Sequence, residues 1–421
     1  MNAPGPAGAA ADSPPPVSPH PPSSPLAGDV LAHLDTDDVV ALTARLVRCA
    51  GTNPPGQEEA TARELAAIAG ELGLPAELVE VAPGRPNVVV TLPGGDGPAL
   101  LLLGHTDVVP VGQGWTRDPF GAVVQDGRLY GRGATDMKGG LAAALTAMAA
   151  LRRAGAALSG PVVLVAAVDE EENGLGARAW VAGHLPRLAG CIVAEPTDLQ
   201  PIIAARGDAY LRITVEGRAA HSGDPSDGRN AIGGAAAVVR ALETWHADLG
   251  AAPPVLGGLV GPATVSVGTI RGGVSTTTVP AQCVVEVDRR LLPGEDPEQM
   301  LADVQARVAA LRLEQRELAV HVELTMDMPG FATAADDPFV RATMRALDAA
   351  GGPGLAPAGW TAACDGGFVA RATGAPVVVL GAGSVTDQAH RPDESVGVGE
   401  LAIASRCYAL LALEVLSTAR T

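Results

Sequence analysis

The sequence predicts an α/β protein with a mixed, mostly parallel sheet, into which a second, smaller α+β domain of ferredoxin-like type is inserted. Three stretches are short apolar runs without polar alternation, which is typical of strands buried on both faces: residues 99–103, 161–168 and 376–380. Alternation of apolar and polar residues begins only at Tyr210, where it favours antiparallel strands with one exposed face. After residue 326 the earlier pattern returns.

The domain boundaries follow from this change of pattern. Between residues 207 and 326 the predicted order is strand, helix, strand, strand, helix, strand, which suits a small α+β sandwich. We therefore predict one domain made of residues 28–206 and 327–421, with residues 207–326 inserted into it. Residues 1–27 are mostly Ala, Pro, Ser and Gly, and we expect a disordered tail because they cannot bury enough apolar surface.

The remaining elements follow from capping residues and from apolar periodicity. Asp35 or Thr36 is a suitable N-cap for a first helix, which the Pro- and Gly-rich residues 53–56 would end. Further helices are expected at residues 58–72, 141–151, 230–245, 297–311, 338–349 and 399–416. Further strands are expected at residues 87–92, 191–194, 210–215, 264–270, 282–288 and 320–326.

Composition and charge argue against some classes of function. The formal net charge of -18 disfavours nucleic acid and anionic membranes as partners, since both attract basic surfaces, and favours a cytoplasmic protein. We expect no membrane-spanning segment and no secretory signal. The 5 cysteines are scattered, which disfavours a disulfide framework or a structural zinc site and predicts small buried side chains.

Histidine and carboxylate side chains follow the predicted buried strands where these strands end. His105 and Asp107 come after the strand at residues 99–103, and they should emerge side by side because residues i and i+2 of an extended chain point the same way. Open α/β sheets bind ligands at such strand ends. Further donors stand at other strand ends, ahead of a helix, or near the end of the chain: Asp136, Glu170, Glu171, Glu195 and His390.

These donors suit metal chemistry. Imidazole and carboxylate ligands suit zinc, with cobalt or manganese as alternatives. The carboxylates outnumber the ligands of one tetrahedral ion, so we expect two Zn²⁺ that share a carboxylate, with one acid left as a general base. Taken singly, each residue has a plainer interpretation, because a strand-end acid is usually solvated and Asp136 could act only as an N-cap.

Six short segments together resemble the M20 family of dinuclear-zinc hydrolases, which includes acetylornithine deacetylase, succinyl-diaminopimelate desuccinylase and glutamate carboxypeptidase. They are residues 104–110, 131–140, 169–171, 176–178, 195–197 and 389–394. Each segment alone is a weak signal, but six in this order make chance an inadequate explanation. The resemblance implies a zinc-peptidase-like fold for the main domain and a lid and dimerisation role for the inserted one.

The resemblance also implies the metal ligands. His105 and Glu195 would bind one ion, Glu171 and His390 would bind the other, and Asp136 would bridge both. Members of this family carry a cis peptide bond after the bridging aspartate.

Two further roles come from the same resemblance. Asp107 would orient His105, and Glu170 would be the general base. Glu172 lies outside the pattern and is interpreted as a solvated acid. Glutamate rather than aspartate at position 195 resembles the deacylase and carboxypeptidase branch more than the aminopeptidase branch.

The inserted domain carries three expected substrate-binding residues. His221 resembles the lid histidine that reaches the partner subunit's active site and stabilises the oxyanion. Arg290 matches the arginine that pairs with a substrate carboxylate, and its neighbour Arg289 would face the other way on the strand. Thr277 stands where relatives often have asparagine, so its hydrogen bond would have a shorter reach.

We therefore interpret the chain as a cytoplasmic, dimeric, two-zinc hydrolase that cleaves an amide bond in an N-acyl amino acid or short peptide, as a deacylase or a carboxypeptidase. One alternative is a dipeptidase or aminopeptidase of the same family. Another is a non-catalytic, metal-containing binding protein on the same fold. The sequence does not identify the acyl group or the amino acid.

Overall fold

The computed structural model describes residues 25–417, so the predicted tail lies outside this range except for its last three residues, which begin helix α1 (Pro25–Ala32). In the described range, a nine-stranded sheet forms the centre of the main domain. Its strands are β1 (Ala76–Ala82), β2 (Arg85–Leu92), β3 (Ala99–His105), β6 (Val162–Ala167), β7 (Leu188–Val193), β8 (Ile202–Ala205), β13 (Phe331–Ala332), β14 (Ala358–Trp360) and β15 (Val377–Val379).

The predicted fold class is confirmed. The sheet order is β1-β2-β6-β3-β7-β15-β8-β13, with β14 paired to β8. The central strands β6, β3, β7 and β15 are parallel to one another, whereas antiparallel pairs lie toward the edges. All seven residues of β3 are buried, as expected for a strand covered on both faces.

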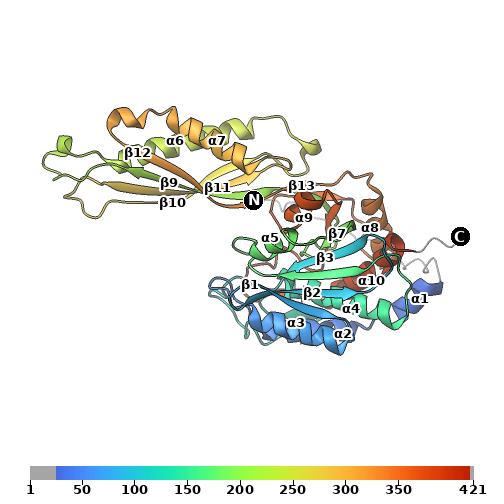
Figure 1. Cartoon of the computed structure of the whole chain (residues 1–421). Coiled ribbons are helices and arrows are strands. Elements are labelled where there is room, and N and C mark those ends of the chain that lie inside the picture. The colour runs from blue at the N-terminus through green and yellow to red at the C-terminus, as the bar shows by residue number, and fades with distance from the viewer. Residues whose placement is uncertain (1–24, 418–421) are drawn as a thin grey trace, which may run out of the picture.

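Helices cover both faces of this sheet (Figure 1). One face carries α2 (Thr36–Arg48), α3 (Glu59–Glu71), α4 (Gly139–Arg153) and α10 (Val398–Val415), and α8 (Pro338–Ala349) packs on α10. The other face carries α5 (Leu175–Val181) and α9 (Gly366–Thr373). Asp35 accepts a hydrogen bond from the Asp37 amide and is therefore the N-cap of α2.

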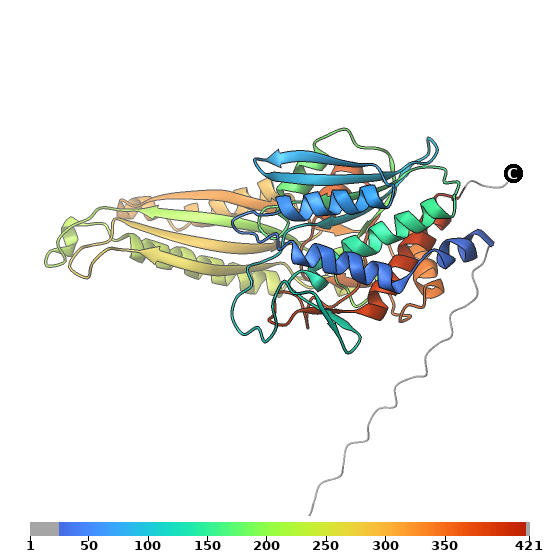
Figure 2. The same ribbon diagram turned by 90° about the horizontal axis from the view of Figure 1, so that it is seen from below.

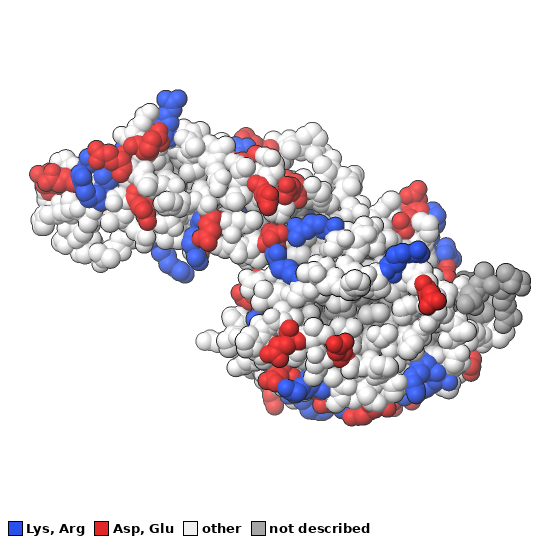
Figure 3. Space-filling view, in the orientation of Figure 1, with Lys and Arg blue, Asp and Glu red and all other residues white. Residues whose placement is uncertain are grey.

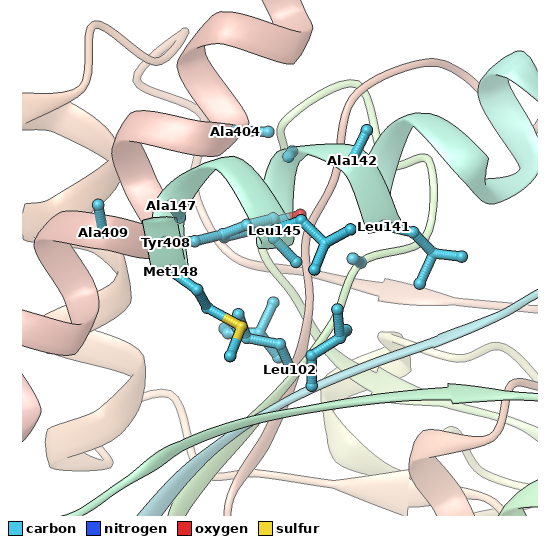
Figure 4. Packing of buried hydrophobic residues seen from close by; sticks show 14 of the residues in the cluster. Leu102, Leu141, Ala142, Leu145, Ala147, Met148, Ala404, Tyr408 and Ala409 are labelled. Carbon is cyan, nitrogen blue, oxygen red and sulfur yellow. The ribbon is translucent and has the colours of Figure 1, made fainter. Parts of the chain in front are cut away.

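Alanine-rich helices allow close packing beneath the central strands. Figure 4 shows Leu102 of β3 against Leu145 and Met148 of α4, with Tyr408 of α10 alongside. The Tyr408 hydroxyl donates to the carbonyl of Leu380 at 2.6 Å, so this buried polar group is satisfied. The core is therefore built mainly from small and branched side chains, which agrees with an aromatic content of only 3%.

The inserted domain is an antiparallel sheet with two helices on one face. Within residues 207–328, β9 (Gly207–Glu216), β10 (Thr264–Gly272), β11 (Gln282–Leu291) and β12 (Ala319–Met328) pair in the order β10-β11-β9-β12. The helices α6 (Ala231–Gly250) and α7 (Pro297–Ala309) bury the apolar side of the alternating strands. This ferredoxin-like arrangement extends to one side of the main domain (Figure 2). The exact domain boundaries remain a prediction.

Several elements were not predicted. They are β1, α1, α5, α9, the short strands β8, β13 and β14, and a small sheet of β4 (Val123–Gln125), β5 (Arg128–Tyr130) and β16 (Ser395–Gly397). Most are short, and β1 has an exposed surface, so neither a long apolar run nor a clear periodicity marks them.

Acidic and basic side chains are interspersed over the face of the molecule seen in Figure 3. None of the helices between residues 25 and 417 combines the length and apolar character that crossing a bilayer requires. The cysteines are free, and all except the partly exposed Cys49 are buried, as predicted.

Candidate metal centre

Three neighbouring parallel strands deliver most of the predicted site residues to one edge of the sheet. β3 ends at His105, β6 is followed by Asp169, Glu170 and Glu171, and β7 is followed by Glu195 after one residue. Because β6, β3 and β7 are adjacent and parallel, their carboxyl ends meet at the same edge. These side chains therefore lie at the carboxyl ends of buried strands, as the sequence predicts.

Asp136 lies between two histidines. Its Oδ1 lies 3.1 Å from His105 Nε2, and its Oδ2 lies 3.4 Å from His390 Nε2. The residue belongs to the turn η1 (Ala134–Lys138), which leads directly into α4. The Asp136–Met137 peptide bond is cis, as the family resemblance implies.

A glutamate joins each histidine to complete two groups of donors. Glu195 Oε1 lies 3.3 Å from His105 Nε2, and Glu171 Oε2 lies 3.0 Å from His390 Nε2. Among the described residues, these form two three-residue groups that share Asp136, and within each group the ligand atoms lie within 4.8 Å of one another. All five predicted metal ligands therefore lie together.

The site is closed on one side and open on the other. The side chain of His105 is 1% exposed and that of Glu195 is 5% exposed, whereas His390 is 52% exposed. Glu170 Oε2 lies 3.9 Å from His105 Nε2, next to the first group. A small molecule can therefore approach the donors from the side of His390.

Several buried carboxylates lie close together in this site. Burial, together with Asp136, raises the pKa of Glu195 to about 8, and burial also raises the pKa of Glu170 and Glu171. Hydrogen bonds to Asp136 and Glu171 raise the pKa of His390 to about 10. Glu171 Oε1 is buried without a hydrogen-bond partner. Three carboxylates, two imidazoles and a buried carboxylate oxygen without a partner fit divalent cations.

Asp107 contacts both the first histidine and the acids. Its backbone carbonyl lies 3.0 Å from His105 Nδ1, and its Oδ1 lies 3.6 Å from the same nitrogen. The carboxylate accepts hydrogen bonds from the amides of Glu170 and Glu171, at 3.2 and 3.1 Å. Asp107 therefore lies where it can orient His105, and it also fixes the backbone that carries the two glutamates.

Glu394 holds the Asp136 turn, and the sequence reasoning assigned it no role. This fully buried carboxylate accepts hydrogen bonds from the amides of Thr135 and Asp136, at 3.0 and 3.1 Å, and pairs with Arg132 at 2.5 Å. Its position four residues after His390 in one of the matching segments is the signal that could have identified it.

The loop at residues 51–58 forms a second part of the site that was missed. The sequence predicts only a helix end at residues 53–56, yet Asn53 Nδ2 donates to Asp107 at 3.0 Å and to Asp169 at 2.9 Å. Thr52 forms a β-bridge with Val108, which holds this loop beside the strand end that carries His105.

The predicted lid residues lie apart from the donors within one chain. His221 and Thr277 are exposed, and the chain segments that carry them are joined by a β-bridge between His221 and Thr278. Across residues 25–417 of a single chain, no hydrogen bond or ion pair connects His221, Thr277 or Arg290 to the metal-binding groups.

Arg290 is already paired with acids. Its guanidinium makes two hydrogen bonds to Asp288, at 2.8 and 3.0 Å, and Nη1 lies 3.1 Å from Asp208. Arg289 faces the other side of the strand, where it contacts Glu295 and lies over the Trp245 ring, as predicted. Glu172 is exposed, in agreement with its interpretation as a solvated acid.

Comparison with known proteins identifies the family. The model of peptidase family M20/M25/M40 matches residues 101–414. The chain belongs to this family. An acetylornithine deacetylase of Proteus mirabilis is 34% identical over 317 residues, which cover 74% of this chain and 78% of the relative. A succinyl-diaminopimelate desuccinylase of Methylobacterium sp. is 33% identical over 383 residues, which cover 87% of this chain and 93% of the relative.

Solved structures agree with the M20 fold. The M20 family metallo-carboxypeptidase Sso-CP2 from Sulfolobus solfataricus has a TM-score of 0.75 at 20% identity, covering 89% of this chain and 98% of its own. Human carnosine dipeptidase 1 has a TM-score of 0.67 at 18% identity, covering 92% and 99%. At these identities the similarity concerns the fold alone. Family membership and the donor groups make this protein a metal-dependent hydrolase that acts on C–N bonds and uses divalent metal ions.

Proposed function

We propose that this protein hydrolyses the amide bond of N-acyl amino acids or of short peptides with a free C-terminal carboxylate, using two Zn²⁺ ions, with Co²⁺ or Mn²⁺ as possible substitutes. The observation that carries the proposal is the pair of donor groups that share Asp136, with Glu170 beside them. His105 and Glu195 would hold one ion, and Glu171 and His390 would hold the other.

The chemistry divides between the ions and the chain. When bound, the two ions would polarise the scissile carbonyl and make water a nucleophile near neutral pH. Glu170 would take the proton from the attacking water as the water oxygen bonds to the carbonyl carbon. It would then return that proton to the nitrogen as the C–N bond breaks, so that an amine and a carboxylate leave.

The location of Glu170 supports its role as the base. Burial raises the pKa of its carboxyl well above the usual range, which increases its affinity for a proton. The backbone amide of Glu170 donates to Asp107. The backbone at Glu170 is therefore fixed without using the Glu170 carboxylate, which stays free to accept a proton. A base fixed in this way loses little freedom when substrate binds.

The substrate class rests on the relatives and on the lid. The two curated relatives described above are a deacetylase and a desuccinylase of amino acid derivatives, which favours deacylation. Arg290 would release Asp288 and pair with the substrate carboxylate in its place. Thr277 would add a hydrogen bond. His221 would reach the active site of the partner subunit in a homodimer and donate to the oxyanion. A cytoplasmic location stays a prediction.

The direct experiment is a substrate panel. N-acetyl, N-succinyl and N-formyl amino acids, dipeptides and tripeptides are incubated with the zinc- or cobalt-loaded protein, and the released amine is measured. We expect turnover of N-acyl amino acids. Turnover of dipeptides or tripeptides alone would identify the peptidase alternative, and no turnover of any member by protein with bound metal would favour a binding protein.

Glu170→Ala tests the assignment of the base. We expect turnover to fall by roughly 10²–10⁴-fold, the usual contribution of a general base, while the metal content stays the same. The matched control is Glu172→Ala, which removes an exposed neighbouring carboxylate and should leave turnover unchanged. Retained turnover in Glu170→Ala would contradict the assignment.

A further inference from the structure

We propose that Arg85 is a positioning residue for the segment that carries Glu170 and Glu171, and that it acts through Asp169. The proposal rests on the proposed function only for the roles of the two glutamates. Arg85 opens strand β2, on the far side of β6 from His105 in the sheet, and nothing in the sequence reasoning singled it out.

The guanidinium of Arg85 lies between two buried carboxylates. Nε donates to Glu58 Oε2 at 2.9 Å, and Nη2 donates to Glu58 Oε1 and, at 2.7 Å, to Asp169 Oδ1. Glu58 is 0% exposed and Asp169 is 1% exposed. Two carboxylates this deeply buried require a positive partner, and Arg85 supplies it.

Asp169 is the residue immediately before Glu170, and its backbone has a left-handed conformation with φ 67. This conformation is uncommon for a residue with a side chain, so surrounding contacts must maintain it. The side chain is held by Arg85 and by Asn53, and the carbonyl accepts hydrogen bonds from the amides of Asn173 and Gly174, at 3.1 and 2.6 Å.

Asn53 connects the Arg85 contact, which anchors Asp169, to a second anchor made by Asp107. Its side-chain nitrogen donates to Asp169 Oδ1 and to Asp107 Oδ2, and Asp107 accepts the amides of Glu170 and Glu171. The segment 169–171 is therefore fixed at its first residue by Arg85 and at the next two by Asp107. Loss of the Arg85 contact should leave the other four metal ligands in place, because they lie outside this segment, but allow Glu170 and Glu171 to move.

Gly56 provides an independent observation on the same contact. It has φ +83, and a Cβ built on it would lie 2.6 Å from Arg85 Nε. A side chain at position 56 would therefore displace the guanidinium from Glu58 and Asp169. The loop 51–58 thus supplies Asn53, Gly56 and Glu58 to the same network.

The test compares Arg85→Lys with Arg45→Lys. Lysine cannot bridge two carboxylates with a planar fork, so Arg85→Lys should weaken the anchor while keeping the charge. Arg45 is the matched control, because it also pairs with two carboxylates, those of Glu64 and Glu71, but makes no hydrogen bond to the segment 169–171.

The first readout does not depend on activity. Hydrogen exchange of the metal-free protein is followed by mass spectrometry for peptides that cover residues 168–174. We expect faster exchange there in Arg85→Lys and unchanged exchange in Arg45→Lys. Unchanged exchange in Arg85→Lys, or equal acceleration in both variants, would overturn the proposal.

The second readout separates positioning from general stabilisation. Under conditions where both variants are folded and loaded with zinc, we expect kcat of Arg85→Lys to fall roughly 10–100-fold with KM and zinc stoichiometry unchanged. Wild-type kcat in that variant would overturn the proposal. If the wild-type protein turns over no substrate, the exchange result still decides the role of Arg85, and only the proposed function fails.

If Arg85→Lys does not fold, Gly56→Ala replaces it. The new methyl group displaces the same guanidinium without removing a charge. The same acceleration of exchange at residues 168–174 and the same fall in kcat are expected. Their absence in folded Gly56→Ala would overturn the proposal.

Discussion

Replacing Glu394 by alanine should destabilise the protein strongly, because it breaks a buried ion pair at the metal centre. Glu394 is 0% exposed, and its partner Arg132 is 2% exposed. The change leaves the Arg132 guanidinium without its carboxylate and removes the acceptor of the Thr135 and Asp136 amides. Removing one partner of a buried ion pair typically destabilises a protein by about 3–5 kcal/mol. The two backbone amides that lose their acceptor add to this cost.

The assay is urea unfolding of the metal-free variant and wild type, followed by circular dichroism. We expect a lower midpoint with a similar dependence on urea concentration, which indicates a change in stability rather than in the surface exposed. Glu414→Ala is the control, since it removes a solvent-exposed pair with Arg345 and should change stability by less than about 1 kcal/mol.

A double variant tests the physical reason. If the cost comes from an uncompensated buried charge, Arg132→Met combined with Glu394→Ala should be less destabilised than Glu394→Ala alone. A cost below about 1 kcal/mol for Glu394→Ala, or a double variant at least as unstable as the sum of the singles, would refute this reasoning.

Three further predictions concern other parts of the chain. Gly140→Ala places a methyl group 2.2 Å from the carbonyl oxygen of Ala194, the residue just before a metal ligand. Thermal unfolding should show a loss of stability of roughly 1–3 kcal/mol. In the control Gly70→Ala the methyl group meets no atom within 4 Å, so stability should be unchanged or rise by up to about 1 kcal/mol. Burial raises the pKa of Asp208 to about 6, above its unfolded value of about 3.9. Between about pH 3.9 and pH 6 the folded state therefore keeps a proton that the unfolded state releases. Stability falls as the pH rises through this window. Asp208→Asn does not titrate, so its stability relative to wild type should improve by roughly 2 kcal/mol from pH 4 to pH 7 in urea unfolding. A pH-independent difference would contradict this. Lys138 is the one lysine of the sequence and is fully buried, so an amine reagent should modify it in urea but not in the native protein, and rapid native labelling would show that the burial is wrong.

Much of the site could be predicted from local sequence, because each ligand stands at the end of a recognisable element. An apolar run such as residues 99–103 has to be a buried strand, and whatever follows it lies at the sheet edge. The residues His105, Glu171 and Glu195 were found in this way. Asp136 and His390 were placed by their segments and by the resemblance, and the structure brings them to the same point.

The supporting residues could not be predicted because their partners are distant in sequence. Arg85 and Asp169 are 84 positions apart, and Arg132 and Glu394 are 262 positions apart. A charged residue with no periodic or motif signal looks like a surface residue until the fold places its partner. The loop at residues 53–56 has an obvious local interpretation as a helix end, and this concealed the role of Asn53.

The lid residues show a different limit. His221, Thr277 and Arg290 were chosen from the resemblance, and one chain alone leaves the first two exposed and the third paired with Asp208 and Asp288. Their proposed roles require a second subunit or a bound substrate, so neither the sequence nor a single chain can place them at the donors.

Two metal ions that share Asp136 are central to the proposed function. Anomalous diffraction from zinc-loaded crystals, recorded at the zinc absorption edge, locates the ions without reference to activity. We predict two peaks per chain on opposite sides of the Asp136 carboxylate, one beside His105 and Glu195 and the other beside Glu171 and His390. A single peak, or peaks away from these residues, would contradict the account.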